Sequence, residues 1–195
     1  LNSYDAIGGI DADRVVRFYL RGRQGWAHQP TYEDVLELVT RSPAMTEEPA
    51  VQMAVIRAGA NRVQVLSRDG VAFIERREGR TEPEYRVVSE RGDPVHLASS
   101  PRLAALARSG WHGSRAWLEA SVDADFPDFV PQVVEMFDSP HTGDIVLFAA
   151  EDWSFDTAQR GGHGSIWKRD MQVPLFFSGP DLPRGAEIGP GRQVD

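Results

Sequence analysis

The stretch Gly143–Ala150 (GDIVLFAA) indicates more about the fold than any other part of the sequence. It is an apolar run without polar alternation, which is typical of a strand covered by helices on both faces. A second apolar run, Met171–Pro180 (MQVPLFFSGP), follows it along the chain. Both runs predict core strands. The loop between them contains Gly161–Ser165 (GGHGS), so His163 lies where α/β proteins usually carry their chemistry.

His163 is flanked by glycines, which allow a sharp turn and a close approach of a ligand or a metal ion. The sequence leaves two interpretations open, a chemically active histidine and a loop histidine without a chemical role. A single histidine does not make a metal site, so spacing alone favours the second interpretation.

Composition argues against several classes of protein. The chain has 195 residues, 41% of them hydrophobic and 26% charged, which is ordinary for a globular protein. A net charge of −8 argues against nucleic acid or an anionic membrane surface as the main partner. The absence of cysteine excludes disulfides and thiol nucleophiles, so any metal must be held by His, Asp and Glu. No run approaches transmembrane length, and the compartment stays open.

The first half of the chain has the periodicity of β-strands. Residues 1–13 are mixed and are expected to be irregular, whereas Val15–Leu20 is expected to be a strand. Thr31 predicts the N-cap of a helix, because acidic residues and a helical apolar face follow it. Val51–Val88 combines alternating apolar residues with turn signals, such as the Asp-Gly pair at 69–70. This pattern predicts an antiparallel meander with one buried face.

Helix signals follow in the second half. Ser100 and Pro101 predict an N-cap and first turn of a helix that continues through Ala107. Residues 114–120 favour a short helix. Residues 126–137 favour another, because their apolar positions are three and four apart.

Together these signals predict an α/β protein with a partly parallel, mixed sheet near the C-terminus, flanked by helices. The antiparallel β-meander precedes it. The turn at Asp93 is the expected boundary between residues 1–93, with a strand, a helix and the meander, and residues 94–195, with the α/β part.

An ordered series of short motifs in the second half resembles a known superfamily. The motifs are Phe126-Pro127-Asp128, Ser139-Pro140, Gly143–Val146, His163-Gly164, Val173-Pro174-Leu175 and Gly179-Pro180. The series is similar to the C-terminal signature of the alkaline phosphatase superfamily, and is closest to the type I phosphodiesterase/nucleotide pyrophosphatase branch. The resemblance covers residues 126–195 well and the earlier part loosely.

The resemblance implies metal-dependent hydrolysis of a small-molecule phosphate or sulfate ester. In the superfamily two zinc ions, or manganese, hold the attacking and leaving oxygens of an in-line displacement, and a Thr or Ser is the nucleophile. His163 would be the last metal ligand in chain order. The sequence contains no Asp-His-Gly and no Asp followed four residues later by His, so neither further ligands nor a nucleophile can be placed.

The resemblance therefore implies that residues 94–195 are the C-terminal part of a hydrolase core and that residues 1–93 are an insert or cap. The chain is expected to be a fragment of a larger protein, to contribute one metal ligand and to be inactive alone.

Four other polar residues near His163 have two interpretations each. Asp156 and Asp170 are candidates to orient the histidine or contact the substrate, and Lys168 and Arg169 are candidates to face a phosphate. The alternative is that all four are solvated loop residues.

Two classes of function stay open at this stage. The first is the metal-dependent hydrolase. The second is a non-catalytic binding or interaction domain, in which the meander Val51–Val88 offers an exposed edge to a partner. A degenerate superfamily member lies between the two. The substrate could be a phosphate monoester, a diester, a phosphonate or a sulfate ester, and the oligomeric state is undetermined.

Overall fold

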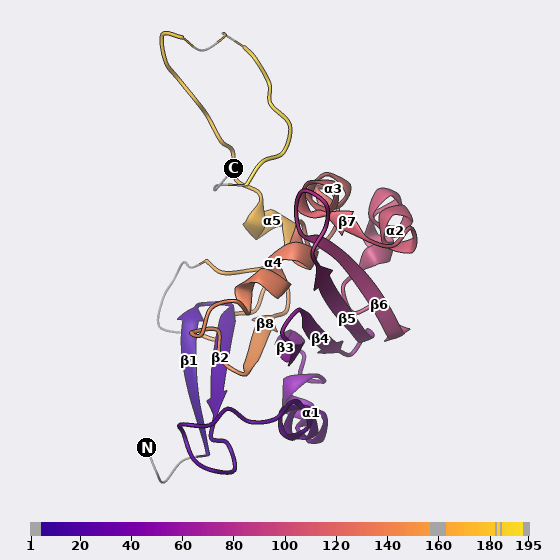
Figure 1. Ribbon diagram of the computed structural model, residues 1–195. Helices are drawn as coiled ribbons and strands as arrows, with labels where there is room; N and C mark the ends of the chain where they lie inside the picture. The colour runs from indigo at the N-terminus through magenta and orange to yellow at the C-terminus, as the bar shows by residue number, and fades with distance from the viewer. Residues whose placement is uncertain (1–4, 157–162, 182, 184, 193–195) are drawn as a thin grey trace.

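One eight-stranded sheet forms the centre of the computed structural model, which describes residues 5–156, 163–181, 183 and 185–192 (Figure 1). The strands are β1 Ala6–Ala12, β2 Val15–Leu20, β3 Val51–Gly59, β4 Arg62–Ser67, β5 Gly70–Arg77, β6 Glu84–Gly92, β7 His112–Gly113 and β8 Ile145–Ala149. Their order across the sheet is β1-β2-β8-β3-β4-β5-β6-β7. The α-helices are α1 Tyr32–Arg41, α2 Pro101–Arg108, α3 Ser114–Ser121, α4 Phe129–Met136 and α5 Lys168–Met171, and the 3-10 helices are η1 Pro43–Met45 and η2 Leu97–Ser99.

Helices cover both faces of the central strands. On one face α2, α3 and α4 form a core cluster that includes the fully buried Trp117 and, from β8, Phe148. On the other face Val39 of α1 packs in a second cluster with Leu147 of β8. Successive β8 side chains point to opposite faces, and all five residues of this strand are buried. The predicted strand in the run Gly143–Ala150 is therefore confirmed.

The prediction of a partly parallel sheet is wrong. β8 lies between β2 and β3 and is antiparallel to both, with Val15 opposite Phe148 and Val51 opposite Ala149. All other neighbouring strands are antiparallel as well. An uninterrupted apolar run reports burial on both faces and carries no information about strand direction.

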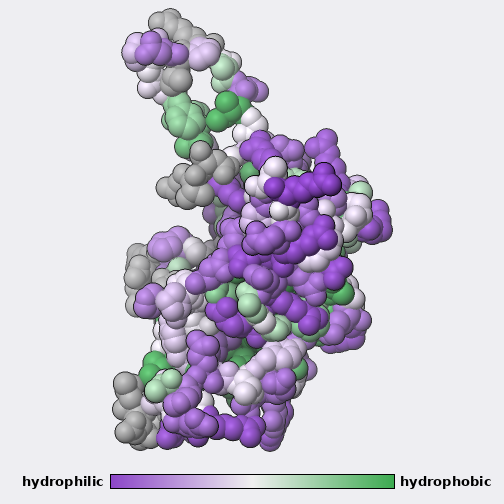
Figure 2. All heavy atoms as spheres, viewed as in Figure 1, coloured by the Kyte–Doolittle hydropathy of each residue, from purple (hydrophilic) through white to green (hydrophobic). Residues whose placement is uncertain are grey.

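The second apolar run is also not a strand. Its first residue, Met171, is the last residue of helix α5, and the segment that follows is irregular. Its side chains are exposed, with exposed fractions of 77% for Val173 and 86% for Phe176. No backbone hydrogen bond joins residues 173–181 to the rest of the described chain. The loop projects from the body in Figure 1, and Figure 2 shows hydrophobic atoms on it.

The irregular start predicted for residues 1–13 is wrong for β1, which pairs with β2 from Ala6↔Leu20 to Ala12↔Val15. The glycines at 8 and 9 weaken the strand signal in the sequence, and the pairing partner compensates for it. Residues 1–4 lie outside the described part.

Most elements of the first half are confirmed. The meander is present as β3 to β6, and α1 begins with a capping box in which Thr31 and Asp34 bond to each other's backbone N–H. Ser100 is the N-cap of α2, as expected. The helix expected over residues 126–137 is α4, which starts later because Asp128 has a left-handed backbone (φ 57°).

Strands from both sides of Asp93 build the one sheet. β1 to β6 precede this residue, and β8, which follows it, is inserted between β2 and β3. No helix among the described residues is long and apolar enough to cross a membrane.

Candidate functional site

The carboxyl end of β8 lies beside the amino ends of β2 and β3. The backbone N–H of Ala149 donates to the carbonyl of Arg14 (3.0 Å), and that of Ala150 donates to the carbonyl of Ala50 (2.9 Å). The connector after β8 turns back over this end, where the Phe155 N–H donates to the carbonyl of Asp13 (2.7 Å). Three chain segments therefore meet at one end of the sheet.

The segment that starts α5 covers this end. Trp167 donates its indole N–H to the carbonyl of Ala149 (3.3 Å), and the Lys168 backbone N–H donates to the carbonyl of Asp125 (2.8 Å). An open hollow of about 390 Å³ lies here. Its lining residues are Asp125, Glu151, Trp167, Lys168, Arg169 and Gln172.

Lys168 and Arg169, the two candidate phosphate contacts, both line this hollow, and each is paired with a carboxylate. Lys168 Nζ lies 2.9 Å from Asp123 Oδ1, a hydrogen bond that lowers the pKa of Asp123. Arg169 bonds to Asp152, which raises the pKa of the guanidinium, and lies 3.6 Å from Glu151. A phosphate would have to displace these carboxylates or add to them, and it would meet their negative charge.

Asp170 and Asp156, the candidates to orient His163 or contact the substrate, take part in two different sets of contacts. Asp170 Oδ1 lies 3.9 Å from Arg169 Nε. Asp170 Oδ2 accepts a hydrogen bond from Arg14 Nη1 at 2.8 Å, and so ties α5 to the turn between β1 and β2. Asp156 forms a local turn with Ser154, whose hydroxyl donates to the Asp156 carbonyl (2.7 Å).

His163 is exposed, and its ring makes no hydrogen bond or ion pair with the described residues. The next residue, Gly164, fixes its place: φ is +87°, and a Cβ at this position would lie 2.3 Å from Cβ of Ala12. Only glycine fits this approach, which seats the loop against the turn between β1 and β2. His163 and Asp170 thus lie near the same turn, through Ala12 and Arg14 respectively.

The described residues do not form the zinc centre that the sequence resemblance implies. Nowhere in the part of the chain that the structure describes do three or more His, Asp or Glu side chains gather as metal ligands. A catalytic zinc needs three protein ligands, and His163 supplies one imidazole. The residues present therefore do not fit a complete two-metal centre.

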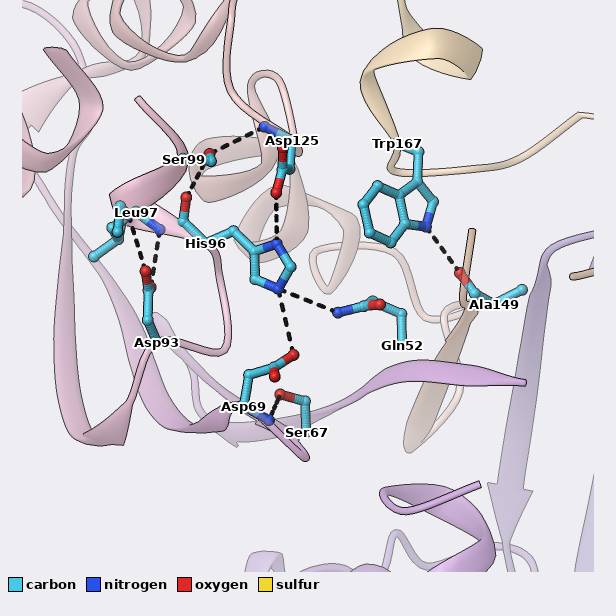
Figure 3. A network of polar contacts seen from close by, with 11 residues as sticks. Gln52, Ser67, Asp69, Asp93, His96, Leu97, Ser99, Asp125, Ala149 and Trp167 are labelled. Atoms are coloured by element: carbon cyan, nitrogen blue, oxygen red, sulfur yellow. Dashed lines mark hydrogen bonds and ion pairs between the residues drawn. The ribbon is translucent and has the colours of Figure 1, made fainter. Parts of the chain in front are cut away.

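A second histidine lies in a dense polar network at the same end of the sheet (Figure 3). His96 Nδ1 lies 2.8 Å from Asp125 Oδ2. Its Nε2 lies 3.3 Å from Asp69 Oδ2 and 3.4 Å from the side-chain nitrogen of Gln52. Gln52 belongs to β3, Asp69 to the turn after β4, and Asp125 to the linker before α4. One imidazole therefore joins three separate segments.

The His96 ring and backbone are both firmly held. The ring stacks on Phe126 at a centroid distance of 4.5 Å and meets the edge of Trp167 at 6.1 Å. The backbone is left-handed (φ 53°, ψ 43°), which is uncommon outside glycine. Asp93 stabilises it by accepting the backbone N–H groups of the next two residues at 2.8 and 2.9 Å. Strained residues held in this way cluster at functional sites.

The sequence analysis missed His96, and the reason is topological. Its partners Asp69 and Asp125 are 27 and 29 residues away along the chain, so no short motif joins them. The turn that presents Asp69 depends on the close crossing of Gly70 and Gly92, which are opposite each other in β5 and β6. The sequence shows the Asp-Gly pair, but it does not show that the Asp69 side chain faces His96.

No protein-family model, curated protein or solved structure matches this chain.

Proposed function

We propose that this chain is part of a metal-dependent phosphoesterase, in which His163 supplies one imidazole ligand to zinc and the chain alone is inactive. The observation that carries the proposal is the exposed ring of His163, which has no hydrogen-bond partner among the described residues and is fixed by Gly164 at the end of the sheet. The remaining ligands would come from polypeptide outside the described residues.

The charges at this end of the sheet favour binding of a metal ion before binding of the anionic ester. Both cations of the hollow are already neutralised by carboxylates. A divalent ion reverses the local field and would let an acidic protein bind a phosphate ester. Lys168 and Arg169 would then contact the ester from the side of α5, and Trp167 would supply an apolar wall.

Hydrolysis assays test this proposal. 4-Nitrophenyl phosphate and bis(4-nitrophenyl) phosphate would be offered, with added zinc, to this chain and to the protein encoded with any sequence upstream of Leu1. We expect turnover in the longer protein only, and a loss of at least about 100-fold in kcat in His163→Ala. His28→Ala, which removes another exposed histidine, is the matched control. Equal turnover in the His163→Ala variant would refute the proposal.

A second candidate function, a non-catalytic interaction domain, is favoured by one observation. The loop after α5 exposes consecutive large apolar side chains, with 66% of Phe177 and 69% of the distant Ile188 accessible. Exposed apolar groups of this kind are common at protein contacts. The meander itself offers less edge than expected, because β3, β4 and β5 are paired on both sides and the start of β6 is paired with the two-residue strand β7.

A further inference from the structure

We propose a divalent-metal site at His96, with His96 Nε2, the carboxylate of Asp69 and the side-chain amide oxygen of Gln52 as ligands. This site is separate from the one proposed at His163 and does not depend on it. Two of its three ligands are ionisable and the third is an amide, so the site differs from a cluster of three His, Asp or Glu side chains.

The first argument is convergence on one ring nitrogen. Asp69 Oδ2, from the turn after β4, and the Gln52 side-chain nitrogen, from β3, approach His96 Nε2 at 3.3 and 3.4 Å (Figure 3). Two ligands bound at about 2.1 Å in a tetrahedral zinc site are about 3.4 Å apart. The observed spacings are therefore those of ligands around a common ion, and little movement is needed to admit one.

The second argument concerns the Asp69 carboxylate. If Nδ1–H donates to Asp125, the Nε2 lone pair of the neutral ring accepts an N–H from the Gln52 amide, but it also faces the Asp69 carboxylate, which then receives no proton from the ring. If Nε2 is protonated and donates to Asp69, it faces the NH₂ group of Gln52. The two ends of an amide are interchangeable by a 180° rotation, so the oxygen of Gln52 can take the inner position. A cation then satisfies Nε2, Asp69 and Gln52 together.

The third argument concerns the groups behind the ligands. A metal-binding histidine usually donates its other ring N–H to a carboxylate, which fixes the tautomer and orients the ring. Asp125 occupies this position at 2.8 Å from Nδ1, and Phe126 packs on the ring face. Gln52 is 8% exposed, so its amide faces the ring from within the protein rather than from solvent.

Accessibility and donor chemistry define the kind of ion. The His96 side chain is 22% exposed and that of Asp69 is 53% exposed, so an ion can enter from solvent and keep bound water. One imidazole nitrogen with two oxygens suits zinc or manganese rather than a thiolate-preferring ion. The carboxylates of Asp69 and Asp125 supply the matching negative charge.

Zinc titration of the full chain, followed by isothermal calorimetry, tests the proposal. We expect His163→Ala to retain a zinc-binding event that Asp69→Asn weakens by at least about tenfold, and that Asp125→Asn weakens by about 10–100-fold. His96→Asn, whose side chain tolerates the left-handed backbone, should abolish it. Gln52→Glu should strengthen it. His28→Ala is the control for binding to an exposed histidine.

Thermal unfolding without metal would show that Asp69→Asn, at a half-exposed turn, remains folded. The proposal is overturned if His163→Ala binds no zinc, or if Asp69→Asn and His96→Asn bind it as tightly as the parent. It is also overturned if ¹⁵N spectra show His96 protonated on both nitrogens and unchanged by saturating zinc, since the network would then be an ion pair only.

Discussion

Individual charged residues in this protein differ in how far their ion pairs are buried. The side chain of Asp128 is only 4% exposed, and it accepts hydrogen bonds from two nitrogens of Arg192, one at 2.8 Å. Gln132 also donates to this carboxylate. The Arg41–Glu37 pair on α1, in contrast, is largely exposed. Burial decides what each pair contributes, because solvent screens exposed charges.

Arg192→Met should lower the free energy of unfolding by about 3 kcal/mol, because it leaves the buried Asp128 charge without its main partner. Arg41→Met, at an exposed pair, should change it by less than about 0.5 kcal/mol. Urea denaturation of both variants checks this. Equal effects would show that Asp128 is not held by Arg192.

Asp34 gives a pH-dependent prediction. Hydrogen bonds from Arg23 and then Thr31 lower its pKa to about 2. A pKa that is lower in the folded state stabilises the fold above the unfolded value, and this stabilisation is lost as the pH falls from about 4 towards 2. Arg23→Ala should raise the pKa of Asp34, as measured by a ¹³C carboxyl titration. An unchanged pKa in Arg23→Ala would contradict the assignment of Arg23 as the main cause.

At the scale of elements, two similar apolar runs have different structures. The run that forms β8 is buried between two helical layers, whereas the run after α5 is exposed. Hydrophobicity alone does not separate them, because a strand also needs a neighbour with free backbone groups. Pro174 and Pro180, which lack N–H donors, were the local signal against a paired strand.

Phe148→Ala and Phe176→Ala are a matched pair for this difference. Phe148 of β8 is 4% exposed, so its truncation should lower the free energy of unfolding by about 3–5 kcal/mol. Phe176 is 86% exposed, and its truncation should change stability by less than about 0.5 kcal/mol. If both variants lost stability equally, the exposed loop would have to pack on the fold in solution.

The crossing at Gly70 is a second test at this scale. A Cβ there would lie 1.9 Å from the Arg91 carbonyl oxygen, and φ is +148°. Gly70→Ala should therefore destabilise the protein by more than about 1 kcal/mol and displace the adjacent Asp69. Gly9→Ala, where a Cβ meets nothing within 4 Å, is the control. A neutral Gly70→Ala would contradict the close crossing of β5 and β6.

At the scale of the whole molecule, local signals predicted elements and not their arrangement. The Thr31 and Ser100 caps, the meander and the strand from Ile145 to Ala149 were predictable because their signals are local. The insertion of β8 between β2 and β3 was not, because strand order depends on contacts distant in sequence.

The residues of the candidate site were likewise predictable only where their signals are local in the sequence. Lys168 and Arg169 were found from their nearness to His163 in the sequence, and they do share a hollow. The network of His96 was not found, because it forms only when the turn after β4, the start of β3 and the linker before α4 come together. Both histidines lie towards the end of the sheet where β8 ends.

Zinc content measured by elemental analysis tests the central claim, that His163 is a ligand of a catalytic metal, most directly. The protein would be prepared with any coding sequence upstream of Leu1, in four forms: unchanged, His163→Ala, His28→Ala and His96→Asn. We predict that His163→Ala loses phosphodiester hydrolysis and the zinc held at His163, but keeps the zinc bound at His96. His28→Ala should keep the zinc and the hydrolysis, and His96→Asn should keep the hydrolysis. Full zinc content and full hydrolysis in His163→Ala would contradict the account.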